Sequence, residues 1–128
     1  MSLITTLKHD HAEIFRLLDE SRALGVATDE GRRKLKQLRG IVAAHLKRED
    51  LKLYPEMQKH DATRALGEMY ANEMRAISTE ILGFFDALES GRAGLEFARE
   101  MGRVISHLRQ RMTREEVRLY PAFEAHCE

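Results

Sequence analysis

The sequence predicts an all-α fold: an up-down-up-down antiparallel four-helix bundle with an internal pseudo-two-fold duplication. Apolar residues recur at helical spacing in four segments, and strand-like alternation is absent over any useful length. The loops between the segments are short, as they are between antiparallel neighbours in a bundle. A phrase running from His45 to Pro55 is echoed at a constant offset between Arg111 and Pro121. The repeat indicates two helical hairpins that face each other across one core.

The first two helices are each marked by an apolar stripe. The first stripe consists of Leu3, Leu7, His11, Ile14 and Leu18, and the second of Leu35, Leu38, Val42, His45 and Glu49. Gly25 and Gly31 bracket the loop between them. Thr28 is a candidate N-cap for the second helix, because Asp29 and Glu30 follow it and acidic residues favour a helix start.

The last two helices repeat this pattern. The third stripe consists of Tyr70, Met74, Ile77, Ile81, Phe84 and Leu88, and the fourth of Phe97, Met101, Val104, Leu108, Arg111, Glu115 and Leu119. The segment from Glu89 to Gly94 interrupts the pattern between them. Pro55 and Pro121 fall within or at the end of the second and fourth helices, where a missing amide donor should kink or stop each helix.

Length and composition limit the classes of function. The 128 residues suit one domain spanning 1–128, with a core of useful size. The 21 basic and 21 acidic residues balance, which argues against nucleic-acid or membrane-surface partners. The sole cysteine, Cys127, is typical of a reducing compartment, and the start of the chain lacks the features of a signal peptide. We therefore expect a cytoplasmic protein.

Polar residues on the apolar stripes point to a metal site. His45 and Glu49 are four residues apart and differ by about 40° around the helix, so both can address one point in the core. Buried glutamates such as Glu49 and Glu115 need a cation between them, and histidines, here His11 and His45, can complete the shell of a metal ion. A lone buried histidine is more often a structural core residue, but here the polar residues occupy equivalent positions of a repeat.

Three features of the sequence resemble the hemerythrin-like (HHE cation-binding) family. They are the helix with His11, the His45-x-x-x-Glu49 spacing that runs into Leu-Tyr-Pro, and the pair Glu115-Glu116 followed by a second Leu-Tyr-Pro. The resemblance covers nearly the whole chain. It implies a left-handed four-helix bundle around a non-haem di-iron centre that binds or senses dioxygen, nitric oxide or redox state. It also implies His11, His45, Glu49 and Glu115 as ligands, with both glutamates bridging.

Two ligand positions implied by the resemblance are substituted. Met74 and Arg111 stand where the family has histidines, so the second-metal half-site is degenerate. His107, one turn before Arg111, is the nearest substitute ligand on that helix. Arg111 also carries a permanent positive charge with a planar fork suited to carboxylates, and could replace a metal ion between Glu49 and Glu115.

Three functions follow from this pattern. The first is a metal-binding module with one iron ion rather than two, or with zinc, which senses a small diatomic ligand. The second is the family's di-iron chemistry, with replacement ligands from His107, Glu73 or Glu116. The third is a metal-free bundle that binds a protein partner, in which Arg111 bridges the two glutamates. None of the three is an enzyme, and the sequence carries no nucleophile–base triad or phosphate loop.

Overall fold

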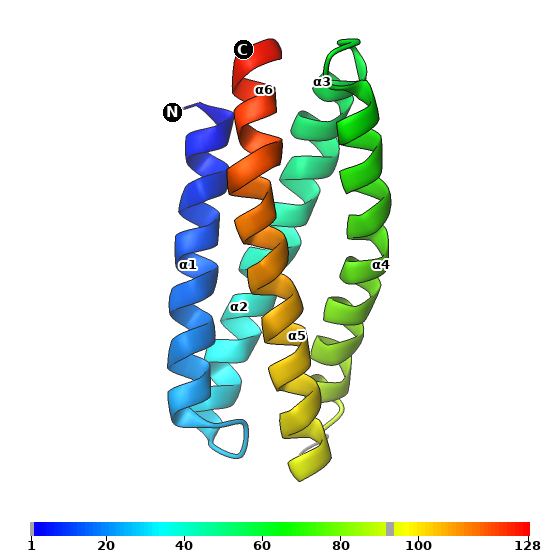
Figure 1. Cartoon of the computed structure of the whole chain (residues 1–128). Coiled ribbons are helices and arrows are strands. Elements are labelled where there is room, and N and C mark those ends of the chain that lie inside the picture. Colours follow the sequence, from blue (N-terminus) through cyan, green and yellow to red (C-terminus); the bar gives the residue numbers. More distant parts are fainter. Residues whose placement is uncertain (1, 92–93) are drawn as a thin grey trace.

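The computed structural model describes residues 2–91 and 94–128, and these form an antiparallel four-helix bundle (Figure 1). The first hairpin consists of α1 (Leu3–Leu24) and α2 (Asp29–Arg48), which continues through η1 (Glu49–Leu53) into α3 (Tyr54–Gln58). The second consists of α4 (Arg64–Glu89) and α5 (Leu95–Arg114), which continues through η2 (Glu115–Leu119) into α6 (Tyr120–His126). The all-α bundle class is confirmed, and the start of α1 and the end of α6 lie at the same end of the bundle.

Each long helix packs against two neighbours. Helix α1 contacts α2 and α5, and α4 contacts the same two helices. The expected break between the third and fourth stripes corresponds to the end of α4 at Glu89 and the start of α5 at Leu95, although residues 92–93 within it lie outside the described residues. Within the described part of the chain, no helix has the length and apolarity that a bilayer span requires.

The loop between α1 and α2 follows the expected capping chemistry. The Thr28 hydroxyl accepts a hydrogen bond from the Gly31 amide at 3.0 Å, so Thr28 is the N-cap of α2. Gly25 ends α1 with a φ of 82°, a left-handed conformation that glycine adopts without strain. A Cβ at Gly31 would lie 1.9 Å from the Gly25 carbonyl oxygen, so this close turn requires glycine there.

Both prolines are accommodated by a π-helical turn. The Tyr54 amide donates to the Glu49 carbonyl and the Tyr120 amide donates to the Glu115 carbonyl, five residues back in each case. The wider turn lets the chain pass the proline, which lacks a donor, and go on into a further α-helical segment. Each proline was expected to kink or stop its helix nearby. The observed irregularity is the π turn just before each proline, and the helix goes on to Gln58 in the first copy and to His126 in the second. Each π turn begins at one of the two core glutamates.

A buried polar layer divides the core. One apolar cluster contains Ile14, Val42, Ile81 and Leu108 among its members, and a second contains Leu7, Leu53, Tyr70 and Leu119. Between the two clusters along α1 lies His11, which is 1% exposed. The other buried polar residues of this layer are His45, Glu49, Arg111 and Glu115. The layer is thus enclosed by apolar packing on both sides, where unpaired charge is costly.

Candidate metal centre

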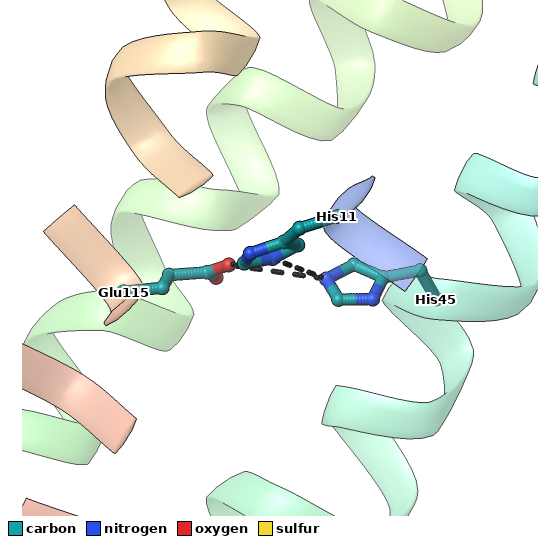
Figure 2. A group of neighbouring side chains, drawn as sticks. All are labelled: His11, His45 and Glu115. Carbon is teal, nitrogen blue, oxygen red and sulfur yellow. Dashed lines mark hydrogen bonds and ion pairs between the residues drawn. The ribbon is translucent and has the colours of Figure 1, made fainter. Parts of the chain in front are cut away.

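Two histidines and a glutamate converge in the buried layer. His11 comes from α1, His45 from α2 and Glu115 from the first position of η2, and all three side chains point toward one another (Figure 2). His11 Nε2 lies 3.2 Å from His45 Nε2 and 3.0 Å from Glu115 Oε1. Glu49 Oε1 lies 3.5 Å from the same Nε2 atom of His45. We call His11, His45, Glu49 and Glu115 the first half-site.

These separations fit donor atoms arranged around one ion. With a metal–nitrogen distance of about 2.0–2.1 Å, two donors at about 90–110° from each other lie roughly 2.8–3.4 Å apart. The 3.2 Å between the two Nε2 atoms and the 3.0 Å from His11 Nε2 to Glu115 Oε1 fall in this range. His45 Nε2 and Glu115 Oε1 are 3.8 Å apart, which a wider angle at the ion accommodates.

The outer nitrogen of each histidine is held by a carboxylate. His11 Nδ1 lies 2.7 Å from Glu116 Oε2, and His45 Nδ1 lies 3.0 Å from Asp10 Oδ2, which also pairs with Arg48. A carboxylate accepts, so each Nδ1 donates, and in the neutral imidazole the Nε2 then carries a lone pair. Two lone pairs facing each other at 3.2 Å require a cation between them, either a proton or a metal ion.

The carboxylates of the layer are only partly satisfied. Among the described atoms, Glu49 Oε1 and Glu115 Oε2 are buried without a hydrogen-bond partner. The Tyr120 hydroxyl donates to Glu49 Oε2 at 2.9 Å and also lies 3.2 Å from Glu115 Oε1. Buried carboxylate oxygens of this kind are costly unless a cation neutralises them. The orphaned oxygen of Glu49 faces His45, where it would complete the donor set of an ion.

The pKa shifts of the buried layer also indicate that its carboxylates need a positive charge nearby. Burial and the neighbouring Glu115 raise the pKa of Glu49 well above its usual range. Burial works against ionisation of Glu115 too, but its close contact with His11 and the positive charge of the nearby His45 hold its pKa below the usual range. Burial lowers the pKa of His45, but its hydrogen bond to Asp10 and the nearby carboxylates of Glu49 and Glu115 outweigh this and raise the pKa to about 10. Without a metal ion, a proton on His45 supplies the missing charge.

The second half-site, at Met74 and Arg111, is built differently. Met74 is buried in an apolar cluster and takes part in core packing. Arg111 is 2% exposed, and its Nε lies 3.4 Å from Glu115 Oε2. Among the described residues, no ion pair joins Arg111 to Glu49. The expectation that Arg111 bridges both glutamates is corrected: it reaches Glu115 alone, and its other ion pair is with Glu73.

His107 does not join the cluster. Its side chain is 44% exposed, and its Nδ1 lies 3.0 Å from Glu80 Oε2 on α4. The spacing of one turn before Arg111 rotates it by about 40° around the helix, away from the buried stripe. The proposed replacement ligands Glu73 and Glu116 also differ from expectation: Glu73 pairs with Arg111, and Glu116 holds His11.

Periodicity missed the residues that orient the ligands. Asp10 and Glu116 each stand next to a core residue in sequence, about 100° around the helix, so a search for apolar stripes places them toward solvent. The sequence feature that could have identified them is their position, because each is a carboxylate residue directly next to His11 or Glu115 in the chain. The tyrosine of the second Leu-Tyr-Pro phrase also takes part, because the Tyr120 hydroxyl donates a hydrogen bond to Glu49.

Comparisons with known proteins agree with this geometry. The family model described as "Hemerythrin HHE cation binding domain" matches residues 2–123. Comparisons with curated proteins and with solved structures gave no match. The matched range contains both π turns and every residue of the first half-site.

Proposed function

The chain belongs to the family of hemerythrin HHE cation-binding domains, and from that premise we propose that it binds one iron ion at the first half-site. In this proposal the protein uses the ion to bind or sense dioxygen, nitric oxide or redox state, and does not turn over a substrate. The ion would be held by His11, His45 and Glu115, with Glu49 as a further donor. When bound, iron supplies an exchangeable coordination position and one-electron redox chemistry.

One observation carries the proposal: the Nε2 atoms of His11 and His45 face each other at 3.2 Å while each Nδ1 is held by a carboxylate. This is the outer arrangement of metal-bound histidines, in which the second ring nitrogen donates to a carboxylate that fixes the tautomer and the ring orientation. Asp10 is itself held by Arg48, so the orientation of His45 does not depend on the ion.

The donor set favours iron. Two imidazoles and one carboxylate with further positions open are typical of non-haem iron sites. Zinc would accept the same donors together with Glu49 as a closed four-ligand site, but it would leave no position for a diatomic ligand. The second half-site argues for one ion, since Met74 is packed in an apolar cluster and the Arg111 guanidinium stands beside Glu115.

Anaerobic titration with ferrous iron, followed by desalting and elemental analysis, tests the proposal. We expect one ion per chain in the parent protein and a loss of binding in His11→Ala and His45→Ala. His107→Ala is the matched control, because it removes an exposed histidine outside the cluster and should bind iron as the parent does. Equal iron retention in His45→Ala and His107→Ala would overturn the assignment of the site.

The sensing part of the proposal has its own readout. Nitric oxide or dioxygen added to the iron-loaded protein should change its visible absorption, and His107→Ala should respond as the parent does. A ferrous protein whose spectrum is unchanged by both gases would bind iron without the proposed ligand chemistry.

A second candidate function is a metal-free bundle that binds a protein partner. The observation that favours it is the built-in positive charge: the guanidinium beside Glu115 and a His45 whose pKa is raised to about 10 against the effect of its burial. In that case a chelator leaves the melting temperature unchanged and added metal does not raise it. Binding to the native state raises stability by mass action, so strong stabilisation by iron or zinc would exclude this candidate.

A further inference from the structure

The carboxylate–arginine arrangement that orients His45 in the first half-site occurs again in the second. In the first, Asp10 Oδ2 accepts from His45 Nδ1 at 3.0 Å and pairs with Arg48. In the second, Glu73 Oε2 lies 3.1 Å from Arg111 Nη1 and 3.2 Å from Arg114 Nη1. In each half-site, a carboxylate on the first helix of the hairpin therefore contacts two residues of the second helix, one buried in the core and one an outer arginine.

The two carboxylate–arginine arrangements occupy equivalent positions of the sequence repeat. Glu73 precedes Met74 as Asp10 precedes the first histidine ligand, and Arg114 precedes Glu115 as Arg48 precedes Glu49. The second copy thus retains the outer carboxylate and the outer arginine although both inner histidines are replaced. What the carboxylate now holds is the guanidinium of Arg111, at the position that corresponds to His45.

Arg111 is fixed by several further contacts. Its Nη2 donates to the Tyr70 carbonyl at 2.6 Å and to the Tyr54 hydroxyl at 3.3 Å, and its Cζ lies 4.5 Å from the centre of the Tyr70 ring. Its Nε faces Glu115 Oε2 at 3.4 Å. A guanidinium stays charged at every accessible pH, so this group is a permanent positive charge inside the bundle.

Glu115 connects this charge to the first half-site. One of its oxygens, Oε1, lies 3.0 Å from His11 Nε2, and the other, Oε2, faces Arg111. The carboxylate therefore stands between the proposed ion and the guanidinium, as a bridging carboxylate would stand between two ions. A fixed positive charge on one side opposes the addition of positive charge on the other.

We propose that Arg111, positioned by Glu73 and Arg114, is the residue that sets the ion content and charge preference of the site. The guanidinium takes the place of a second cation, limits the site to one ion and favours the less charged, reduced state of that ion. This inference rests on the proposed function for its redox part, whereas its cation-exclusion part applies to any divalent ion.

Titration with cobalt(II), which is stable in air and visible by absorption, tests cation exclusion in three variants. Arg111→Gln removes the charge, and Arg111→His places an imidazole where Glu73 can hold it as Asp10 holds His45. Both should bind cobalt at least about tenfold more tightly than the parent or take up an additional ion, because unit charges at such distances interact strongly in a protein interior. Arg111→Lys keeps the charge and should stay near the parent.

Two controls separate this effect from general damage. Arg109→Gln removes a charge from a half-buried residue of the same helix that pairs with Asp19, and it should leave cobalt binding unchanged. Helix content and the thermal transition of each variant establish that it is folded. If Arg111→Gln does not fold, Arg111→His provides the same comparison, because its imidazole has Glu73 as a ready partner.

The outcomes distinguish the inference from the proposed function. If the parent binds no metal and both charge-removing variants gain binding, the proposed function fails and the role of Arg111 stands. If those variants bind cobalt no better than the parent and Arg111→Lys, the inference is overturned, even if the parent binds one ion. In protein loaded with one equivalent of iron, the reduction potential of Arg111→Gln should fall below that of the parent and Arg111→Lys. An unchanged potential would refute the charge preference.

Discussion

The two tyrosines of the repeat allow a paired test of the hydrogen bonds in the buried layer. Tyr120 donates its hydroxyl to Glu49 Oε2 at 2.9 Å, and the residue is fully buried. Tyr120→Phe leaves that carboxylate oxygen without a donor, and an unsatisfied buried polar group costs about 1–3 kcal/mol. The metal-free variant should therefore unfold at a urea concentration roughly 1 M lower than the parent, for a typical dependence of the unfolding free energy on urea.

Tyr54→Phe is the matched control from the first copy. The Tyr54 hydroxyl accepts a longer bond of 3.3 Å from Arg111 Nη2, which keeps its 2.6 Å bond to the Tyr70 carbonyl in the variant. No buried group is orphaned, so we expect a loss of about 1 kcal/mol or less. Urea denaturation monitored by helix signal, with metal removed, gives both values. Equal losses in the two variants, or a neutral Tyr120→Phe, would refute this reasoning about the layer.

Three further predictions concern the outer carboxylate, the protonation of the layer and the helix cap. Asp10→Asn should weaken iron or zinc affinity about 10–100-fold, because outer partners of a ligand histidine have effects of this size, and exposed Asp61→Asn should not. The pKa of His45 is raised to about 10 from 6.5, so its stabilisation of the metal-free protein is complete below pH 6.5 and lost as pH rises through about 10. Denaturation midpoints measured across that range should fall, and a rise would contradict this. Thr28→Ala should cost about 0.5–2 kcal/mol in thermal unfolding through the lost cap of α2, and no loss would contradict the cap.

Much of the fold could be predicted because burial leaves a periodic trace. The four stripes, the Thr28 cap and the duplication are local or repetitive patterns, and each of them reads directly onto a helix or a helix start. The same periodicity predicted that His11, His45, Glu49 and Glu115 face one common core. It could not show the π turns that begin at Glu49 and Glu115, because a single wider turn does not change the stripe enough to be seen in the sequence.

The parts of the site that escaped prediction depend on angles and side-chain reach. His107 lies four residues before Arg111, which is one helical turn plus about 40°. That difference in direction is enough to place its side chain beside Glu80 on the surface. Arg111 was expected to reach both Glu49 and Glu115, but its long side chain pairs with Glu115 and Glu73 and donates to the Tyr70 carbonyl. Side-chain reach of this kind is set by contacts between helices that are distant in sequence, and periodicity carries no information about them.

X-ray absorption at the iron edge of the iron-loaded protein tests the proposed centre most directly. The proposal predicts a shell of nitrogen and oxygen neighbours with the outer scattering of two imidazoles, no sulfur neighbour from Met74 and no second iron nearby. His45→Ala should lose the imidazole contribution, whereas His107→Ala should retain it. An iron–iron contribution in the parent protein, or a spectrum without imidazole, would contradict the assignment of one ion to His11, His45 and Glu115.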